Sequence, residues 1–469
     1  MAITANDNIK ALLKVYYKDG VENLMFRNSP TLKKLAKNRI EGKSYNFSAM
    51  YGRGGAVAGD FTKAKALAAT VSKNVEFAVE PGQVFSVYNM NAKEVQASQT
   101  QRGAYMKVAG AKMFAASEGF RKTLAASLFG SGYGELCFAP DGVALTASVA
   151  DEITMTPDAI MKIDVGSELV IKTSVAGDAS SIKTTLSVQA INGLKVKVIP
   201  DTTYTTAASD VICLGGSIDA SGAPLLPVGL GGWLPIIAKR TGVSWTQYIA
   251  KPFFGVNRSS AAERLAGAFY EETSSTAKKV DAIQALLMKV RRQGSLADMI
   301  IMNDEDWLEV SKEITAANTY FTQTSTKESK KAALGFDSFS ASFSTNFVEN
   351  IIDDPYCPKG VFYILDSTSV EFNTLTNVDK VNDGVAGNNP GKPDPMSDEN
   401  NGKENDPYKL IIDDYINVAP GQSDVNGPAS EVSLMLSGCF AITNPSNCGV
   451  GLFYGANPVR LSAEGINKR

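Results

Sequence analysis

The sequence contains no histidine among its 469 residues. This absence excludes the Ser-His-Asp and Cys-His nucleophile systems and the HExxH zinc site, because each of them needs an imidazole. Catalysis by two carboxylates or by lysine stays open as an alternative. No candidate pair stands out among the 49 acidic residues. The sequence therefore predicts no enzyme and no catalytic, cofactor-binding or metal site.

Signals for nucleotides, disulfides and membranes are also lacking. Gly391-Lys392 has no upstream P-loop glycine, and Pro393 stands where Ser or Thr belongs. The five cysteines are an odd number without a CxxC pair, which indicates buried thiols in a reducing compartment. No apolar run approaches the roughly 20 residues of a membrane span, and the N-terminal residues lack a signal-peptide core. We expect a cytosolic site of synthesis and no membrane partner.

Charge is nearly balanced overall, at −3, but it is unevenly spread. Residues 1–43 carry nine basic and four acidic side chains, a net of 9 − 4 = +5. Residues 376–414 carry four lysines and nine acids, a net of 4 − 9 = −5. The basic segment suits contact with nucleic acid or an acidic neighbour, and a solvated amphipathic helix is the open alternative.

A glycine-rich stretch follows, with four glycines between Gly52 and Gly59, and nearly every other residue there is small or polar. Apolar residues then alternate at Val75, Phe77 and Val79, which predicts a strand. Glu80-Pro81-Gly82 predicts a type II turn that leads into a return strand, Val84–Tyr88. A two-stranded ribbon alone is marginal in water, so we expect this arm to lie on another molecule. The candidate contact residues are Gly52, Arg53, Gly54, Gly55, Gly59 and Lys63.

A long amphipathic helix is predicted next, from Asn91 to Phe129. Its apolar residues recur in steps of three and four, the spacing of one helix face. A long buried helix in any α/β protein is the alternative interpretation. The residues of the stripe are Tyr105, Ala109, Met113, Ala116, Phe120, Leu124 and Leu128.

In residues 141–231 the spacing of the apolar residues changes from the helical period to the alternation of strands. This change predicts a small β-rich unit inserted between helical regions. Asn192-Gly193 separates two alternating apolar runs, which is a strong hairpin signal. Beyond this unit we predict helices at Ala261–Tyr270, Lys279–Arg292 and Asp304–Ile314, a buried strand at Met299–Met302, and an exposed loop at residues 382–407.

The run LLMKVRRQGSLADMIIMNDEDWLEVSKEI (Leu286 to Ile314) resembles the helix–strand–helix of tailed-phage major capsid proteins of the Hong Kong 97 type. The blocks around Pro358-Lys359-Gly360 and Asp366, and EVSLMLSGCFAITNPSN near the C-terminus, are similar to later strands of that family. GVNRSSAAERLAG is similar to a block in many environmental phage capsid sequences, and YGRGG followed by AGDFTKA is similar to crAss-like gut phages. The matching positions of the first run are Gly294, Ala297, Asp298, Asn303, Asp306 and Trp307.

The resemblance implies an α+β Hong Kong 97-like capsid fold with an inserted all-β domain. The implied parts are an N-terminal arm (1–43), an extended loop called the E-loop (44–90), a peripheral domain with the spine helix (91–140 and 232–280), the insertion (141–231) and an axial domain with return strands to the peripheral domain (281–469).

The function implied is that of a major capsid protein that self-assembles, as hexamers and pentamers, into an icosahedral head around double-stranded DNA. Other implied partners are a separate scaffolding protein, a portal, auxiliary or decoration proteins, and DNA bound without sequence specificity. The implied location is the virion, after assembly in the bacterial cytoplasm. Alternatives are a tail sheath or decoration protein, an encapsulin-like shell, and a histidine-free glycosidase.

Overall fold

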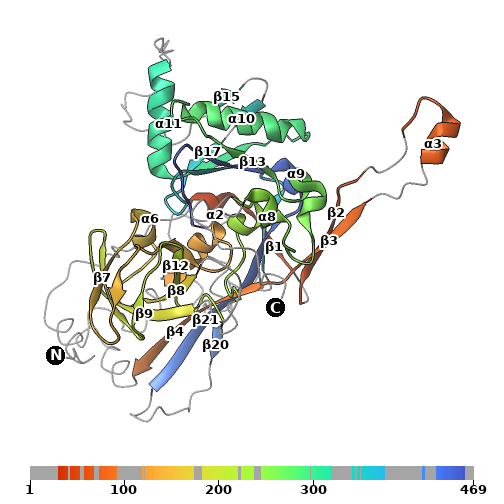
Figure 1. Cartoon of the computed structure of the whole chain (residues 1–469). Coiled ribbons are helices and arrows are strands. Elements are labelled where there is room, and N and C mark those ends of the chain that lie inside the picture. The colour runs from red at the N-terminus through yellow and green to blue at the C-terminus, as the bar shows by residue number, and fades with distance from the viewer. Residues whose placement is uncertain are drawn as a thin grey trace, which may run out of the picture. The chain divides into compact units, whose positions relative to one another are not determined.

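The structure is a computed structural model (Figure 1). It describes residues 30–40, 43–52, 57–67, 73–91, 119–120, 122–173, 182–219, 223–236, 244–295, 297–317, 341–343, 346–348, 350–374, 415–417 and 429–459. The described chain is divided into two compact units. Residues 83–124 and 374–438 belong to the smaller unit, and residues 29–82, 125–373 and 439–469 belong to the larger one.

The smaller unit contains strands β4 (Gly82–Asn91) and β20 (Tyr415–Asn417), both of which pair with β21 (Ala429–Ile442). A helix is described from Gly119 to Leu128, apart from Arg121, and its residues from Ala125 onward belong to the larger unit. Phe120, Leu124 and Leu128 are buried along it at steps of four, as the predicted stripe requires. The remainder of the predicted long helix, residues 92–118, lies outside the described residues.

A five-stranded mixed sheet forms one core of the larger unit, in the order β13-β22-β18-β14-β17. Helix α10 packs on it with Ile283, Leu286 and Val290, and β14 is buried along its whole length between two neighbours. Helix α10 and strand β14 have the bounds that periodicity predicts, so these two predictions are confirmed. The elements are β13 (Ala268–Glu271), α10 (Lys279–Arg292), β14 (Met299–Met302), α11 (Asp304–Ala317), β17 (Asn350–Asp353), β18 (Val361–Leu365) and β22 (Gly449–Leu452).

Smaller elements accompany this sheet. Strand β1 pairs with β19, and β15 pairs with β16. These strands are β1 (Ala36–Arg39), β15 (Ala341–Phe343), β16 (Asn346–Val348) and β19 (Val370–Thr374). The short helices are α2 (Pro30–Lys34), α7 (Leu230–Trp233), α8 (Trp245–Ile249), η3 (Arg258–Ala261), α9 (Ala262–Leu265) and η6 (Pro445–Asn447).

The β-rich part of the sequence forms an antiparallel six-stranded sheet in the order β5-β12-β8-β9-β10-β7. Its inward side chains, among them Leu186, Val188 and Val196, form a separate apolar core. Strand β5 belongs to this sheet although it precedes residue 141. The elements are β5 (Glu135–Phe138), β6 (Ala144–Leu145), β7 (Asp151–Thr154), α6 (Pro157–Ile160), β8 (Glu168–Thr173), β9 (Ile182–Asn192), β10 (Lys195–Pro200), β11 (Tyr204–Thr205) and β12 (Asp210–Leu214).

The hairpin predicted at Asn192-Gly193 is confirmed, with a difference in its turn. Asn192 pairs with Lys195, so the two central residues are Gly193 and Leu194. Gly193 has a φ of 61°, whereas Leu194 does not have a positive φ. A positive φ at the first central position alone is the mark of a type II′ turn. Leu194 therefore lies in the turn and not in the following strand.

The predicted ribbon has a different partner. Strand β3 (Asn74–Val79) pairs with β2 (Tyr45–Met50), and not with the return strand, which is part of β4. The type II turn at Glu80-Pro81-Gly82 is also wrong, because Gly82 does not have a positive φ. A Cβ on Gly82 would lie 2.4 Å from Pro227 N, so the glycine permits a close backbone approach to Pro227.

The helix predicted at Ala261–Tyr270 is only partly present. Helix α9 ends at Leu265, and Ala268–Glu271 forms β13, which pairs in parallel with β22. The hydrogen-bonding partner comes from residues far along the chain, so local periodicity could not reveal it. Most of the predicted basic arm and the loop at 382–407 lie outside the described residues.

Candidate functional site

The β2–β3 arm is joined to the rest of the larger unit by aromatic side chains. Trp233 lies at the centre of this cluster, and its indole N–H donates to the Phe440 carbonyl at 2.8 Å. The rings of Phe47 and Phe77, one from each strand, lie 6.0 and 5.5 Å from Trp233. The edge-on Phe253 ring is 5.0 Å away. Contacts of this kind add about 0.5–1.5 kcal/mol each beyond their buried area, so the base of the arm is firmly held.

Two hydrogen bonds hold the ribbon to the rest of the larger unit, one near each of its ends. The Arg264 guanidinium donates to the Tyr51 carbonyl at 2.8 Å, and the Ala78 N–H donates to the Phe254 carbonyl at 3.5 Å. The residue that follows strand β2 is therefore held by a side chain, and strand β3 by the backbone.

Arg258 is a buried charged residue of this base, and none of its surface is exposed. Its Nη1 donates to the carbonyls of Gly232 and Trp233 at 3.1 and 3.0 Å, and the guanidinium lies 4.1 Å from the Phe253 ring centroid. Within the described part of the chain, its Nε and Nη2 have no partner. Burial lowers the pKa of Arg258 to about 10.

The far end of the arm carries helix α3 (Phe61–Leu67), which Figure 1 shows beyond the β2–β3 ribbon. Asp60 stabilises its first turn, because a side-chain oxygen of Asp60 accepts from the Lys63 N–H at 3.0 Å. Phe61 is 83% exposed, and Val57 and Met50 are also exposed. We call Val57 and Phe61 the arm-end residues. As exposed apolar side chains, they are candidates for contact with another molecule.

Those of the six predicted contact residues that the structure describes lie in different surroundings. The Tyr51 and Gly52 N–H groups both donate to the Lys73 carbonyl, and a Cβ on Gly52 would lie 2.8 Å from the Lys73 Cβ. Gly52 thus permits close strand contact. Gly59 lies in open space, and the Lys63 side chain is exposed on α3. Arg53, Gly54 and Gly55 lie outside the described residues.

Sequence reasoning missed the aromatic base and the arm-end residues. Their signals were present in Lys251–Arg258, which contains paired phenylalanines before an arginine, and in the lone Phe61 of a polar segment. Neither signal indicates which side chains contact one another, because Trp233, Phe47 and Phe253 are distant in sequence.

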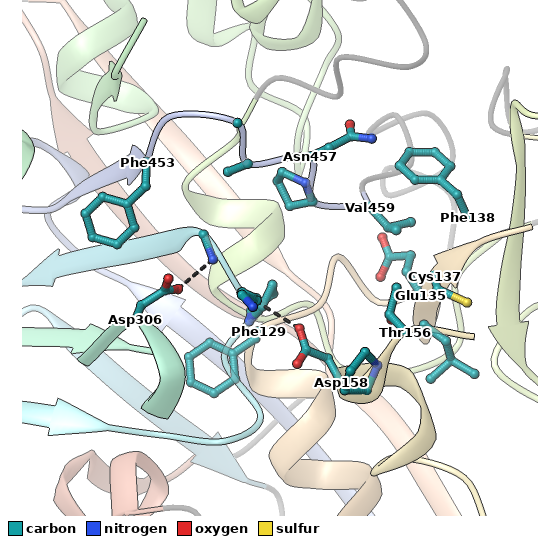
Figure 2. Close-up of a pocket in the computed structure, with 18 of the residues that line it drawn as sticks. Phe129, Glu135, Cys137, Phe138, Thr156, Asp158, Asp306, Phe453, Asn457 and Val459 are labelled. Atoms are coloured by element: carbon teal, nitrogen blue, oxygen red, sulfur yellow. Dashed lines mark hydrogen bonds between the residues drawn. The ribbon is translucent and has the colours of Figure 1, made fainter. Parts of the chain in front are cut away.

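A second feature is a cavity of about 680 Å³ in the larger unit (Figure 2). Its walls come from β5, α6, the turn before β18 and residues 453–459. Asp158 on α6 accepts from the Lys359 N–H at 3.0 Å, so the β-rich sheet is tied to the turn before β18. Burial raises the pKa of Asp158, and the bond from Lys359 only partly offsets this effect.

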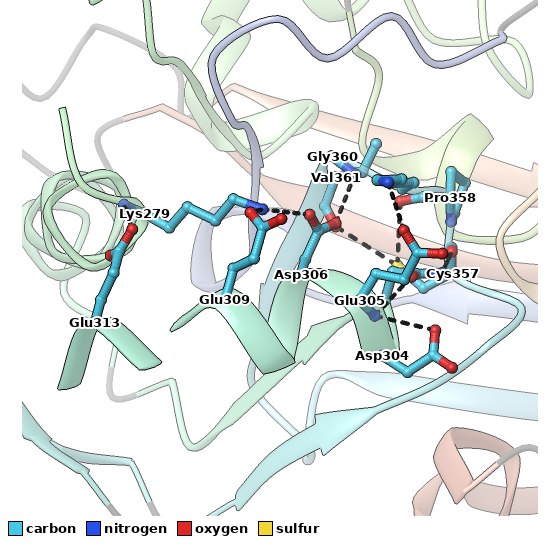
Figure 3. Close-up of polar contacts among 12 residues, drawn as sticks. Lys279, Asp304, Glu305, Asp306, Glu309, Glu313, Cys357, Pro358, Gly360 and Val361 are labelled. Carbon is cyan, nitrogen blue, oxygen red and sulfur yellow. Dashed lines mark hydrogen bonds and ion pairs between the residues drawn. The ribbon is translucent and has the colours of Figure 1, made fainter. Parts of the chain in front are cut away.

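The polar cluster beside the cavity joins α10 to α11 (Figure 3). Lys279 Nζ lies 2.6 Å from both Asp306 and Glu309, and Asp306 also accepts from the Gly360 N–H at 2.6 Å. Lys359 pairs with Glu305. Asp306 is one of the positions that match the capsid family in the run from Leu286 to Ile314. Its role here is structural, because both of its carboxylate oxygens accept hydrogen bonds from protein donors.

In the described residues we find no grouping of three acidic or cysteine side chains that could hold a metal ion. Among the helices of those same residues, none has both the length and the apolar character needed to cross a membrane.

The chain matches no protein-family model and no curated protein sequence. It is similar to the solved "Cyanophage A-1(L) capsid asymmetric unit", with 13% identity, a TM-score of 0.54, and coverage of 97% of this chain and 99% of that one. A chain of the holo-SrpI encapsulin complex from Synechococcus elongatus PCC 7942 matches at 8% identity and a TM-score of 0.43, over 98% and 100% of the two chains. A capsid chain of an empty GTA particle matches at 8% identity and a TM-score of 0.41, over 95% and 96%. The first of these similarities carries the conclusion on fold: the chain has an α+β fold of the kind found in that cyanophage capsid.

Proposed function

We propose that the chain is a structural shell protein, the major capsid protein of a tailed bacteriophage, and that it has no enzymatic role. The observation that carries the proposal is the β2–β3 arm. Its base is fixed by aromatic packing and hydrogen bonds, whereas its end presents Phe61 to solvent. An element built in this way is stable in one subunit and gains its remaining burial only on a neighbour.

In this proposal the arm is the E-loop, and copies of the chain associate as hexamers and pentamers. Burying a phenylalanine side chain contributes about 1.5–3 kcal/mol, and a closed shell repeats each contact many times. The six-stranded sheet is an inserted domain that serves the particle surface or contacts between capsomers. Residues 44–79 are the arm, and the boundaries of the other domains remain those implied by the resemblance.

The remaining partners follow from the same role. A separate scaffolding protein directs assembly, a portal and auxiliary or decoration proteins complete the head, and the enclosed double-stranded DNA is bound without sequence specificity. The protein resides in the virion after assembly in the host cytoplasm. A crAss-like origin stays a prediction from YGRGG and AGDFTKA.

The experiment that tests this function is electron microscopy of the expressed protein, with and without its scaffolding protein. The parent chain is expected to form regular closed shells. The Phe61→Ser variant should keep the parent's melting temperature, because Phe61 is exposed in one subunit, and should need about tenfold more protein to assemble.

The matched control is Thr62→Ala, which changes the neighbouring exposed residue of α3 and should assemble like the parent. Tubes or sheets in place of closed shells would contradict the capsid role. Closed shells from the parent chain without any scaffold would favour an encapsulin-like protein. Normal assembly of the Phe61→Ser variant would show that the arm end is not an intersubunit surface.

A further inference from the structure

The end of the β2–β3 arm presents an aromatic ring and a cation to solvent. Phe61 is 83% exposed and Val57 is 73% exposed. Helix α3 places Phe61 and Lys65 one turn apart on the same face, and both side chains are exposed. Residues 57–67 carry two lysines and one acid, a net of 2 − 1 = +1. A surface that covers this end must therefore be apolar and carry acidic groups nearby.

The cavity of Figure 2 has a surface of that kind. Phe129, Phe138 and Phe453 contribute aromatic rings to its walls. Tyr454 also lines the cavity and is 56% exposed, so apolar surface is left to be covered. The charged lining groups are four acids and three lysines, a net of 3 − 4 = −1. They are Glu135, Asp158, Lys162, Lys279, Asp306, Glu309 and Lys359.

The arm end and the cavity also agree in size. Helix α3 has seven residues and is about 10 Å long, close to the width of about 9 Å that a cube of 680 Å³ would have. Another cavity bounded by described residues, among them Gly132 and Leu214, has a volume of only about 10 Å³. That volume is about the size of one water probe, so it cannot admit a phenylalanine side chain.

The construction of the arm indicates that its end is covered by another molecule. The base is held by the rings of Phe47 and Phe77 against Trp233, and α3 lies at the far end of the ribbon (Figure 1). Each copy of the chain has one arm end and one cavity. A contact between them is head-to-tail, and contacts of this type close into rings.

We propose that the arm end of one subunit docks in the cavity of a second copy, with Phe61 against the aromatic walls and Lys65 beside the acidic groups. This proposal rests on the shell function proposed above, and it names the surface that receives the arm. Three observations carry it: the exposed Phe61 and Val57, the aromatic cavity with its exposed Tyr454, and the opposite net charges of the two surfaces.

The test measures how fast a maleimide labels a thiol introduced into the cavity. Thr156 is exposed, lines the cavity and makes no side-chain cap bond, so Thr156→Cys leaves α6 intact. In closed shells, Thr156→Cys should be labelled about tenfold more slowly than in free subunits. Adding Phe61→Ser should restore fast labelling in shells, whereas adding Thr62→Ala, the matched control on α3, should not. Gln189→Cys, exposed on β9 and outside the cavity, should be labelled equally fast in both kinds of shell.

A second measurement decides if Phe61→Ser prevents assembly. Shells formed from a mixture of Phe61→Cys chains and Thr156→Cys chains should give a disulfide-linked dimer on mild oxidation. The small apolar cysteine side chain keeps part of the contact. Phe61→Cys mixed with Gln189→Cys is the control and should give no such dimer.

Each failure has its own result. Closed shells in which Thr156→Cys reacts as fast as in free subunits would overturn the docking and leave the shell function standing. Protection that persists with Phe61→Ser would overturn the arm end as the occupant. Protection already present in free subunits would show that the cavity is filled within one chain, which also overturns the proposal. If the parent chain forms no closed shells, the proposed function fails and this contact fails with it.

Discussion

At the residue scale, the base of the arm depends on one buried cation. Arg258 gives its hydrogen bonds to two successive carbonyls, Gly232 and Trp233, at the end of α7. Helix ends leave carbonyls without intrahelical partners, and burial makes each unpaired one costly. Arg258 thus positions Trp233, the ring that both strands of the arm contact.

We predict that Arg258→Ala lowers the free energy of unfolding by about 2–4 kcal/mol, because two buried carbonyls lose their donor and the side chain leaves a void. Chemical denaturation measures this change. Ser259→Ala, at the adjacent exposed position, should change stability by less than about 0.5 kcal/mol. If the Arg258→Ala variant were as stable as the parent, the free energy needed to bury the charged guanidinium would equal the stabilisation that its hydrogen bonds provide.

At the element scale, α10 and α11 are coupled through one lysine. Burial alone would lower the pKa of Lys279, but its bonds to Asp306 and Glu309 outweigh burial and raise that pKa. The bond from Lys279 likewise lowers the pKa of Glu309 below its usual 4.5. A carboxylate with a lowered pKa stabilises the fold above its unfolded pKa, and this contribution disappears as the pH falls through the folded value.

We therefore predict that Glu309→Gln lowers the free energy of unfolding by up to about 1 kcal/mol at pH 7, since the Glu309 side chain is 56% exposed and its ion pair is screened. At about pH 3 the variant and the parent should have nearly the same stability. Thermal melts at the two pH values measure the difference. Asp141→Asn, at an exposed turn of the β-rich sheet, is the control and should match the parent at both. A difference that grows on acidification would contradict the assigned sign.

At the scale of the whole molecule, the β-rich sheet has its own apolar core, distinct from that of the mixed sheet. Within the described residues, its strands pair only with one another. Strand β5 pairs with β12 and covers one edge of the sheet. From these features we expect a unit that folds by itself.

We predict that a fragment of residues 133–219 gives a β-type circular dichroism spectrum and a cooperative melt. The shorter fragment 141–219 lacks β5, so the edge of β12 loses its hydrogen-bonding partner, and its melting temperature should be lower. A disordered spectrum from the longer fragment would show that the sheet needs the rest of the chain. Equal melting temperatures would place β5 outside the cooperative unit.

Local patterns determined a good part of this fold. The bounds of α10 and β14 followed from apolar spacing, and the β9–β10 hairpin followed from Asn192-Gly193, because helix faces and tight turns depend on residues that are neighbours in sequence. The expected function came from the resemblance around Asp306 and Trp307, which implied a shell protein but indicated no contact surface.

Strand partners and the site were decided by the tertiary structure alone. The alternation in β3 indicates a strand but is compatible with pairing to β2 or to β4, and only the packing of Phe47 and Phe77 on Trp233 selects β2. From the sequence, Gly82 is compatible with a turn. In the structure, a glycine is required there because the Pro227 backbone approaches too closely for a Cβ. A sequence records which side chains are apolar and where the backbone can bend. Which surfaces meet depends on contacts between residues far apart along the chain, and these form only when the whole unit packs.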